Sequence, residues 1–259
     1  MQWFAGRGWR PREHQLAMLD VERAGDHALL VAATGAGKTL AGFLPTLIDL
    51  IEQPVDGLHT LYVSPLKALA VDVQRNLLTP LAEMELPIRV ETRTGDTPSD
   101  RKARQRVRPP QILLTTPESL SLLLSYPDSA LLFENLKTVV VDEIHAFARE
   151  KRGDLLSLSM SRLQALAPGM RRVGLSATVA DPDAYRSWLA PDADIDLVRL
   201  VQGEPGAEPE LSILIPDGTI PWSGHSGRHA AREVMELIER HKTTSEDRRR
   251  PKIGGRDDD

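Results

Sequence analysis

The chain has 259 residues, of which 41% are hydrophobic and 27% charged, and these proportions predict a globular protein with one large domain, or one domain and part of another. The absence of cysteine excludes disulfides and cysteine-ligated zinc, and the net charge of −5 excludes a polycation, so nucleic-acid binding would need local basic groups and backbone amides. The N-terminus has no apolar signal core and no apolar run reaches the ~20 residues of a membrane span, so we expect a cytoplasmic protein with no membrane partner.

Near-continuous apolar runs alternate with helical patterns along most of the chain. The predicted strands are His27–Ala32, His59–Ser64, Ile88–Thr92, Gln111–Thr116, Lys137–Asp142 and Arg171–Ser176. The predicted helices are Lys38–Glu52, Leu66–Glu85, Asp100–Val107, Glu118–Ser125, Asp154–Ala167 and Asp183–Leu189. Strands that are apolar on both faces are typical of a parallel sheet covered on both sides. The alternation predicts an α/β fold with a doubly wound, mostly parallel sheet over residues 1–195.

The pattern changes after residue 195. Residues 196–242 contain a connector rich in Pro, Asp and Gly, followed by an amphipathic pattern that predicts a C-terminal helix at Gly227–Arg240. The last segment, 243–259, combines blocks of like charge with almost no apolar residues, so we expect a disordered charged tail there.

The segment VAATGAGKT, Val31–Thr39, joins the first predicted strand to the first predicted helix. It matches the end of the G-x-x-x-x-G-K-[ST] pattern, except that Ala32 occupies the first Gly position. In that pattern Lys38 reaches the β- and γ-phosphates, the Thr39 hydroxyl binds Mg²⁺, and the helix N-terminus adds its dipole. The residues expected to hold the nucleotide are therefore Thr34, Gly35, Ala36, Gly37, Lys38 and Thr39. The alternative is a glycine-rich turn without a ligand.

The segment VVVDEIHAF closes a buried strand with two carboxylates. In this architecture ligands bind at the carboxyl ends of the strands, so Asp142 and Glu143 would face the loop at Lys38. Asp142 would hold Mg²⁺, and Glu143 would orient and deprotonate the attacking water. An acidic helix cap is the alternative for this pair alone. Together with the phosphate loop, the pattern favours Glu143, Asp142 and Lys38 as catalytic residues.

The order of the motifs resembles that of superfamily 2 helicases. ATGAGKT, DEIH and SAT (Ser176–Thr178) are similar to motifs I, II and III, GWRPREHQ to the Q-motif, and SPLKALA, TRTGDT and TTPESL to the nucleic-acid-contacting motifs between them. The segments SPLKALAVD, RVETRTGDT, KRGDLL, LSATVADP and IPWSGHS resemble the Lhr (large helicase-related) group, and most of all the ligase-associated DNA-damage-response DEXH-box helicases. The resemblance, from about Phe4 to about Thr244, implies a RecA-like ATPase domain that acts on single-stranded or partly duplex DNA in DNA repair.

The resemblance also implies roles for individual residues. Gln15 would form hydrogen bonds to the adenine edge, which makes ATP the expected nucleotide, bound together with the Mg²⁺ expected at Thr39 and Asp142. The residues that would contact the nucleic-acid backbone are Ser64, Lys67, Gly95, Thr116 and Glu118. The residues that would couple hydrolysis to strand movement are His145, Ser176 and Thr178. Without the family, Gln15 is typical of a solvated helix residue and His145 of a packed histidine. The basic segment Asp100–Arg108 either widens the electrostatic footprint or is a solvated surface helix.

The chain departs from the family in its C-terminal part. It contains no second run of βα units and no motif like the arginine finger that a second RecA-like domain supplies. We therefore expect a motor domain with a linker toward a missing second domain, completed by a partner subunit or second motor domain. Such a chain would bind Mg·ATP weakly, hydrolyse it very slowly and not unwind duplexes alone. The competing hypothesis is a non-motor P-loop ATPase or regulatory ATP-binding module, which would not need SPLKALA, TGDT and TTPESL.

Overall fold

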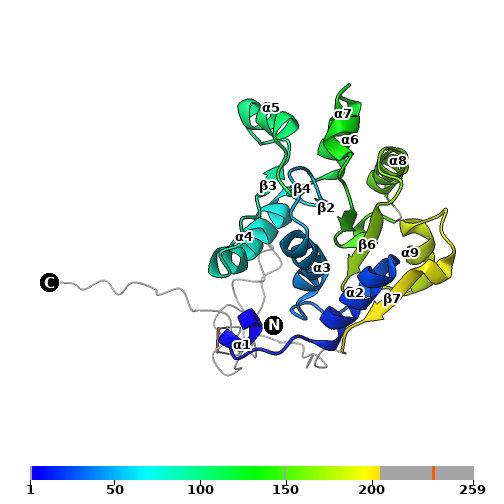
Figure 1. Cartoon of the computed structure of the whole chain (residues 1–259). Helices are drawn as coiled ribbons and strands as arrows, with labels where there is room; N and C mark the ends of the chain where they lie inside the picture. The colour runs from blue at the N-terminus through cyan, green and yellow to red at the C-terminus, as the bar shows by residue number, and fades with distance from the viewer. Residues whose placement is uncertain (1, 149, 205–234, 237–259) are drawn as a thin grey trace, which may run out of the picture. The chain divides into compact units, whose positions relative to one another are not determined.

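The computed structural model describes residues 2–148, 150–204 and 235–236 (Figure 1). The chain divides into two compact units, Met1–Gly206 and Ala207–Asp259. Of the second unit only Met235 and Glu236 belong to the described residues, so the rest of the predicted helix at Gly227–Arg240 and the predicted tail at 243–259 lie outside them. The fold described below is that of the first unit.

The first unit is built on a seven-stranded sheet with the order β3-β4-β2-β5-β6-β1-β7, in which every pair is parallel (Figure 1). The strands are β1 (His27–Val31), β2 (Thr60–Val63), β3 (Val90–Arg93), β4 (Ile112–Thr115), β5 (Thr138–Val141), β6 (Arg171–Ser176) and β7 (Val198–Gln202). All the predicted strands are present, and the predicted α/β fold with a doubly wound parallel sheet is confirmed.

Strand β7 was not predicted, and it lies in the segment interpreted as a connector. It pairs with β1, with His27 opposite Val198, and forms one edge of the sheet. Only Val198 and Val201 of this strand are buried. An edge strand with exposed residues between its buried ones lacks the continuous apolar run that marked the other strands. The first compact unit therefore continues past the predicted boundary at residue 195.

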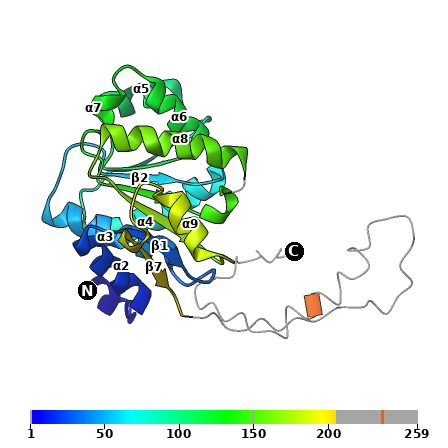
Figure 2. The ribbon, with the colours of Figure 1, turned by 90° about the vertical axis from the view of Figure 1, so that its right-hand side faces the viewer.

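Helices cover both faces of the sheet. They are α1 (Gln2–Gly6), α2 (Glu13–Ala24), α3 (Lys38–Glu52), α4 (Lys67–Glu83), α5 (Ser99–Val107), α6 (Pro117–Ser125), α7 (Ser129–Phe133), α8 (Lys151–Leu166) and α9 (Pro182–Leu189), with two short 3₁₀ helices, η1 (Ile144–Ala146) and η2 (Ile195–Leu197). Figure 2 shows α2 and α3 on one side of the sheet and α6 and α8 on the other. None of the described helices has the length and apolar composition needed to cross a bilayer.

Two hydrophobic clusters separate these layers. Leu61 and Val139 belong to the cluster under α6 and α8, whereas Tyr62 and Val140 belong to the cluster under α3 and α4. This division follows from the strand period, because successive side chains point to opposite faces. Each fully buried Val or Leu stabilises the fold by about 1.5–3 kcal/mol relative to exposure. Strands β2 and β5 are therefore packed on both faces, and their carboxyl ends lead into the sheet edge where the site is predicted.

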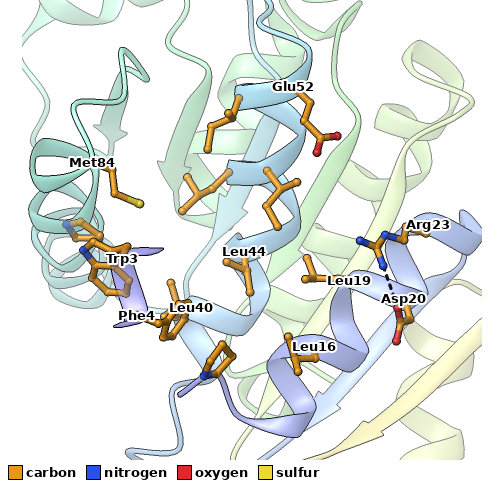
Figure 3. A pocket seen from close by; sticks show the side chains of 15 residues that line it. Trp3, Phe4, Leu16, Leu19, Asp20, Arg23, Leu40, Leu44, Glu52 and Met84 are labelled. Carbon is orange, nitrogen blue, oxygen red and sulfur yellow. Dashed lines mark hydrogen bonds and ion pairs between the residues drawn. The ribbon is translucent and has the colours of Figure 1, made fainter. Parts of the chain in front are cut away.

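An apolar groove of about 690 Å³ runs along the outer side of α3, between α1, α2 and the end of α4 (Figure 3). Phe4, Leu16, Leu40, Leu44 and Met84 are among the residues that line it. None of the predicted catalytic, nucleotide or nucleic-acid residues of the described chain lines this groove. The candidate site must therefore be sought at the carboxyl edge of the sheet.

Candidate nucleotide and nucleic-acid site

The loop between β1 and α3 forms the first part of the site. Gly35 and Gly37 have left-handed backbone angles, with φ of +80° and +77°. Glycine adopts this conformation without the steric cost that a Cβ imposes. A Cβ on Gly37 would also lie 2.8 Å from the Nε2 atom of Gln15. The backbone conformation of Gly37 therefore favours glycine, and a larger residue would also displace the Gln15 amide, while Thr34 and Gly35 are exposed at the loop tip.

The Lys38 side chain turns back into this loop. Its Nζ atom donates to the carbonyl oxygens of Ala32 and Ala33, at 2.8 and 3.2 Å. Burial lowers the pKa of Lys38, and the nearby charges of Glu143 and Asp142 oppose this effect. A nucleotide phosphate would offer Lys38 a charged acceptor in place of two neutral carbonyls, which is the stronger kind of hydrogen bond.

Ala32 occupies the position where the phosphate-loop pattern has its first glycine, and the structure shows what its methyl group meets. Gly203, directly after β7, donates its N–H to the Val31 carbonyl at 2.8 Å. A Cβ on Gly203 would lie 2.5 Å from the Cβ of Ala32. Gly203 therefore leaves the space that the Ala32 methyl fills. No sequence pattern pointed to Gly203, because only the pairing of β7 with β1 brings it to the loop.

The start of α2 holds the loop from the other side. Gln15 is 4% exposed, so its interpretation as a solvated residue is wrong. Its Oε1 accepts from the Arg12 amide at 3.0 Å, and its Nε2 donates to the Gly37 carbonyl at 3.5 Å. The Nε2 atom of His14 lies 2.9 Å from the Ala36 carbonyl and carries the proton, since a carbonyl only accepts. His14 was missed by the sequence analysis. The adenine-binding role of Gln15 stays a prediction.

Asp142 and Glu143 follow β5 at the same edge. Asp142 is 7% exposed and accepts a hydrogen bond from the Tyr62 hydroxyl on its Oδ2 atom. Burial raises the pKa of Asp142, while the bonds from Tyr62 and from the Glu143 amide hold it down. Glu143 has φ of +47°. A non-glycine residue in that region costs about 1–3 kcal/mol, and such residues are enriched at functional sites.

The helix-cap alternative does not account for Glu143. Its backbone precedes η1, but its side chain makes no cap hydrogen bond. Instead its Oε2 atom lies 3.4 Å from the Nδ1 atom of His145. The carboxylate is therefore oriented toward other residues of the site.

The three predicted coupling residues lie together. The Nδ1 atom of His145 is 2.9 Å from the Ser176 hydroxyl, which donates to the Thr178 carbonyl at 3.1 Å. Since the hydroxyl proton is used in that bond, His145 donates from Nδ1. The His145 side chain is 43% exposed, so its interpretation as a packed histidine is wrong. A continuous polar chain thus links Glu143, after β5, to the segment that follows β6.

The predicted nucleic-acid residues follow β2, β3 and β4, but their side chains differ in availability. Ser64 is fully buried and its hydroxyl donates to the Leu66 carbonyl at 3.2 Å. Thr116 is 4% exposed, and its hydroxyl lies 3.4 Å from that of Ser119. The Ser64 amide also donates to the Thr115 carbonyl at 3.0 Å, so Ser64 offers neither side-chain nor backbone groups at the surface, and Thr116 offers very little.

The charged members of this set are exposed and paired. Lys67 donates to Asp96 at 2.8 Å, and its Nζ lies 3.3 Å from the position that a Cβ on Gly95 would occupy. Glu118 accepts two hydrogen bonds from Arg152, at 2.6 and 3.2 Å. Arg152 was missed as a site residue, because its only signal was the KRGDLL segment in a distant part of the sequence. The Lys67 ammonium thus lies beside Gly95, in the loop after β3, and the Arg152 guanidinium lies beside Glu118 on α6.

The basic helix α5 is exposed, but several of its cations have partners. Arg104 pairs with Glu91 and Arg106 with Asp128, each at 2.7 Å, and Lys102 donates to the Gly95 carbonyl at 2.9 Å. These bonds favour the interpretation of α5 as a solvated surface helix over that of a free electrostatic footprint.

The oxygen atoms beside the phosphate loop fit Mg²⁺ as ligands. The Thr39 hydroxyl and the Asp142 carboxylate are oxygen ligands of the kind that Mg²⁺ prefers. The hydrogen bond from the Tyr62 hydroxyl orients the Asp142 carboxylate. Mg²⁺ binds through one or two protein oxygens together with waters and phosphates rather than in a protein cage. The described residues contain no cluster of three or more His, Asp or Glu that could enclose a metal.

A family model described as "DEAD/DEAH box helicase" matches residues 12–186. An Lhr helicase and probable uracil glycosylase from Mycolicibacterium smegmatis is 38% identical over 94% of this chain and 17% of that protein. The ATP-dependent helicase Lhr-Core protein 2 from Thermococcus barophilus is 36% identical over 94% of this chain and 30% of its own length.

A solved structure shows the same arrangement. It is that of Mycobacterium smegmatis helicase Lhr bound to ssDNA and AMP-PNP, with a TM-score of 0.79 and 37% identity over 93% of this chain and 32% of that one. This chain therefore spans less than a third of the length of the relatives it matches.

Proposed function

The chain belongs to the DEAD/DEAH box helicase family, and we propose that its first compact unit is the ATP-hydrolysing domain of an Lhr-type DNA motor. The observation that carries the proposal is the single sheet edge at which the phosphate loop, the Asp142–Glu143 pair and the His145–Ser176 bond meet. The charges of Glu143 and Asp142 act directly on Lys38 across this edge.

In the proposed reaction, ATP binds with its phosphates at residues 34–39 and its adenine at Gln15. Lys38 leaves the carbonyls of Ala32 and Ala33 and binds the β- and γ-phosphates. Mg²⁺, held by Thr39 and Asp142, would neutralise charge on the phosphates. Glu143 orients a water and accepts its proton as the water oxygen bonds the γ-phosphorus and the bond to the ADP oxygen breaks.

The proposed partner is single-stranded or partly duplex DNA. The side chain of Lys67 and backbone groups at Gly95 and Thr116 would follow its phosphates without reading sequence, and Glu118 would contribute by orienting Arg152. The choice of DNA is supported by the Lhr relative that was solved with ssDNA. The His145–Ser176–Thr178 chain would transmit the state of the nucleotide to the strand-binding loops.

Unwinding and DNA repair are proposed for the complete motor rather than for this chain by itself. The relatives are more than three times as long as the part that this chain matches. No arginine-finger motif was recognised in the sequence, and such a residue is worth about 10³–10⁵ in rate. We therefore propose that the 259-residue chain binds Mg·ATP but turns it over slowly.

The test compares the wild-type chain with Glu143→Gln in two assays: binding of a fluorescent ATP analogue, and single-turnover hydrolysis of ATP with and without single-stranded DNA or RNA. Glu143→Gln should bind the analogue as the wild type does and lose about 10²-fold or more in the hydrolysis rate. Lys38→Ala should lose binding itself. Equal hydrolysis rates for wild type and Glu143→Gln would refute the assignment.

The alternative, a non-motor ATP-binding module, is separated by the same assays. In a motor, DNA and nucleotide affect each other's affinity by a common factor. If single-stranded DNA leaves both the affinity for the ATP analogue and the hydrolysis rate unchanged, the motor assignment fails and the module is favoured.

A further inference from the structure

Tyr62 is a buried residue that no sequence motif singled out. It lies on β2 opposite Val140 of β5, and its side chain is fully buried. Its ring stacks on Phe43 of α3, with ring centroids 5.1 Å apart and planes inclined by 24°. Its hydroxyl donates to the Oδ2 atom of Asp142, on the neighbouring strand's carboxyl end.

A phenylalanine at position 62 would present the same ring to the apolar cluster, so packing alone does not explain the hydroxyl. The cluster around Tyr62 consists of apolar side chains such as Leu30, Val140 and Leu175. A buried hydroxyl costs free energy unless it is hydrogen-bonded, so a tyrosine persists there only with a dedicated partner. Among the described residues, the hydroxyl donates its hydrogen bond to Asp142.

The acceptor of this bond is the carboxylate that the proposed function assigns to Mg²⁺. A carboxylate rotates in a broad energy well about its last side-chain bond, so its oxygens need other groups to fix them. The Tyr62 hydroxyl provides such a donor. Through Phe43 the same ring also packs against α3, which carries Lys38 and Thr39 on its first turn.

We propose that Tyr62 is a positioning residue, whose hydroxyl holds the Asp142 carboxylate in the orientation that receives Mg·ATP and whose ring keeps that carboxylate in register with the phosphate-loop helix. The inference rests on the proposed function, because it concerns the metal-binding step of the same site. Through Tyr62, the buried face of β2 would then contribute to nucleotide binding. Residues that orient a metal ligand typically change metal affinity by about 10–100-fold when they are removed.

The test measures the Mg²⁺ dependence of ATP-analogue binding for Tyr62→Phe, which keeps the ring and removes the hydroxyl. The Mg²⁺ concentration at half-maximal binding should rise about tenfold. Binding of the analogue in EDTA and the far-ultraviolet circular dichroism spectrum should stay at wild-type values. A merely structural role would leave the Mg²⁺ midpoint unchanged, and a midpoint within about twofold of the wild type overturns the inference.

Three further variants make the result interpretable. Tyr126→Phe is the matched control, because Tyr126 packs against Arg106 at 4.0 Å and does not contact Asp142; its Mg²⁺ midpoint should not change. Tyr62→Leu removes the ring as well as the hydroxyl, so its Mg²⁺ midpoint should rise at least as much as that of Tyr62→Phe. Asp142→Asn tests the proposed function itself. If Asp142→Asn leaves the Mg²⁺ midpoint unchanged, the proposed metal site at Asp142 is rejected. If Asp142→Asn shifts the midpoint and the Tyr62 variants leave it unchanged, only the positioning role of Tyr62 is rejected.

Discussion

Arg152 and Glu118 lie on different helices and meet at the surface where nucleic acid is predicted to bind. The Arg152 guanidinium beside Glu118 holds the pKa of that carboxyl below its usual range, so Glu118 is ionised. A carboxylate repels phosphates, whereas the guanidinium has more N–H donors than its two bonds to Glu118 use. We infer that Glu118 serves the strand-binding surface by orienting Arg152.

Replacing Arg152 by alanine should weaken single-stranded DNA binding about threefold to tenfold and reduce the slope of log affinity against log salt by about 0.7, the value for one phosphate contact on a single strand. Binding of the ATP analogue should not change. The matched control is Arg75→Ala, since Arg75 is 77% exposed on α4 and lies 3.9 Å from Asp72. Fluorescence anisotropy at several salt concentrations measures both quantities. Identical slopes for Arg152→Ala and wild type would contradict the role.

At the scale of elements, the first turn of α8 packs backbone to backbone against the segment that follows Glu143. A Cβ on Gly153 would lie 2.0 Å from the Phe147 carbonyl oxygen, which is closer than any real contact. The Gly153 amide donates to the Glu150 carbonyl at 2.8 Å, and Phe147 is fully buried. Helix α8 therefore supports η1, and with it the positions of Glu143 and His145.

Gly153→Ala should destabilise the protein by about 1–3 kcal/mol, because the added methyl forces α8 and η1 apart in a packed core. It should also lower ATP hydrolysis, since η1 follows Glu143 directly. Gly169→Ala is the control: no atom lies within 4 Å of the Cβ it would add. Urea unfolding measures the free energy of unfolding of each variant. If Gly153→Ala unfolds at the same urea concentration as Gly169→Ala, the close contact is not structurally important.

At the scale of the whole molecule, the partly buried His27 and the buried His59 make stability depend on pH. Burial lowers the pKa of both His27 and His59; for His27 the charges of Arg172 and Arg171 add to this effect, and for His59 the bond to Asp49 opposes it. The Nδ1 atom of His27 accepts the Arg172 amide at 2.9 Å, so it must be unprotonated in the fold. The unfolded chain binds these protons near the ordinary pKa of about 6.5.

Stability from these histidines is therefore complete above about pH 6.5 and is lost as the pH falls from there toward their lower folded-state pKa values. We expect the Tm to be lower at pH 5.5 than at pH 7.5, and His27→Asn, whose amide oxygen can accept the same hydrogen bond, to reduce that difference. Asp142, whose pKa is raised by burial, acts in the opposite direction at lower pH. Thermal unfolding at both pH values measures the effect. An unchanged pH dependence in His27→Asn would exclude His27 as a source.

The sequence by itself determined the sheet strands with continuous apolar runs, the phosphate loop, and the Asp142–Glu143 pair. These signals are local: an apolar run, two glycines before a lysine, and carboxylates at a strand end can be recognised without knowing what lies opposite. The comparisons support the helicase assignment that the same motifs predicted. The roles of the individual site residues remain predictions, although the structure brings the ATP-binding and coupling groups to one edge.

Only the tertiary structure decided which distant residues complete that edge. Tyr62 and Asp142 are separated by 80 positions and meet because β2 and β5 are neighbours in the sheet. Gly203 reaches Ala32 because β7, an edge strand with a weak apolar pattern, pairs with β1. Arg152 meets Glu118 because α6 and α8 pack side by side on one face. Contacts of this kind depend on strand order and helix packing, which the periodicity of a single segment does not encode.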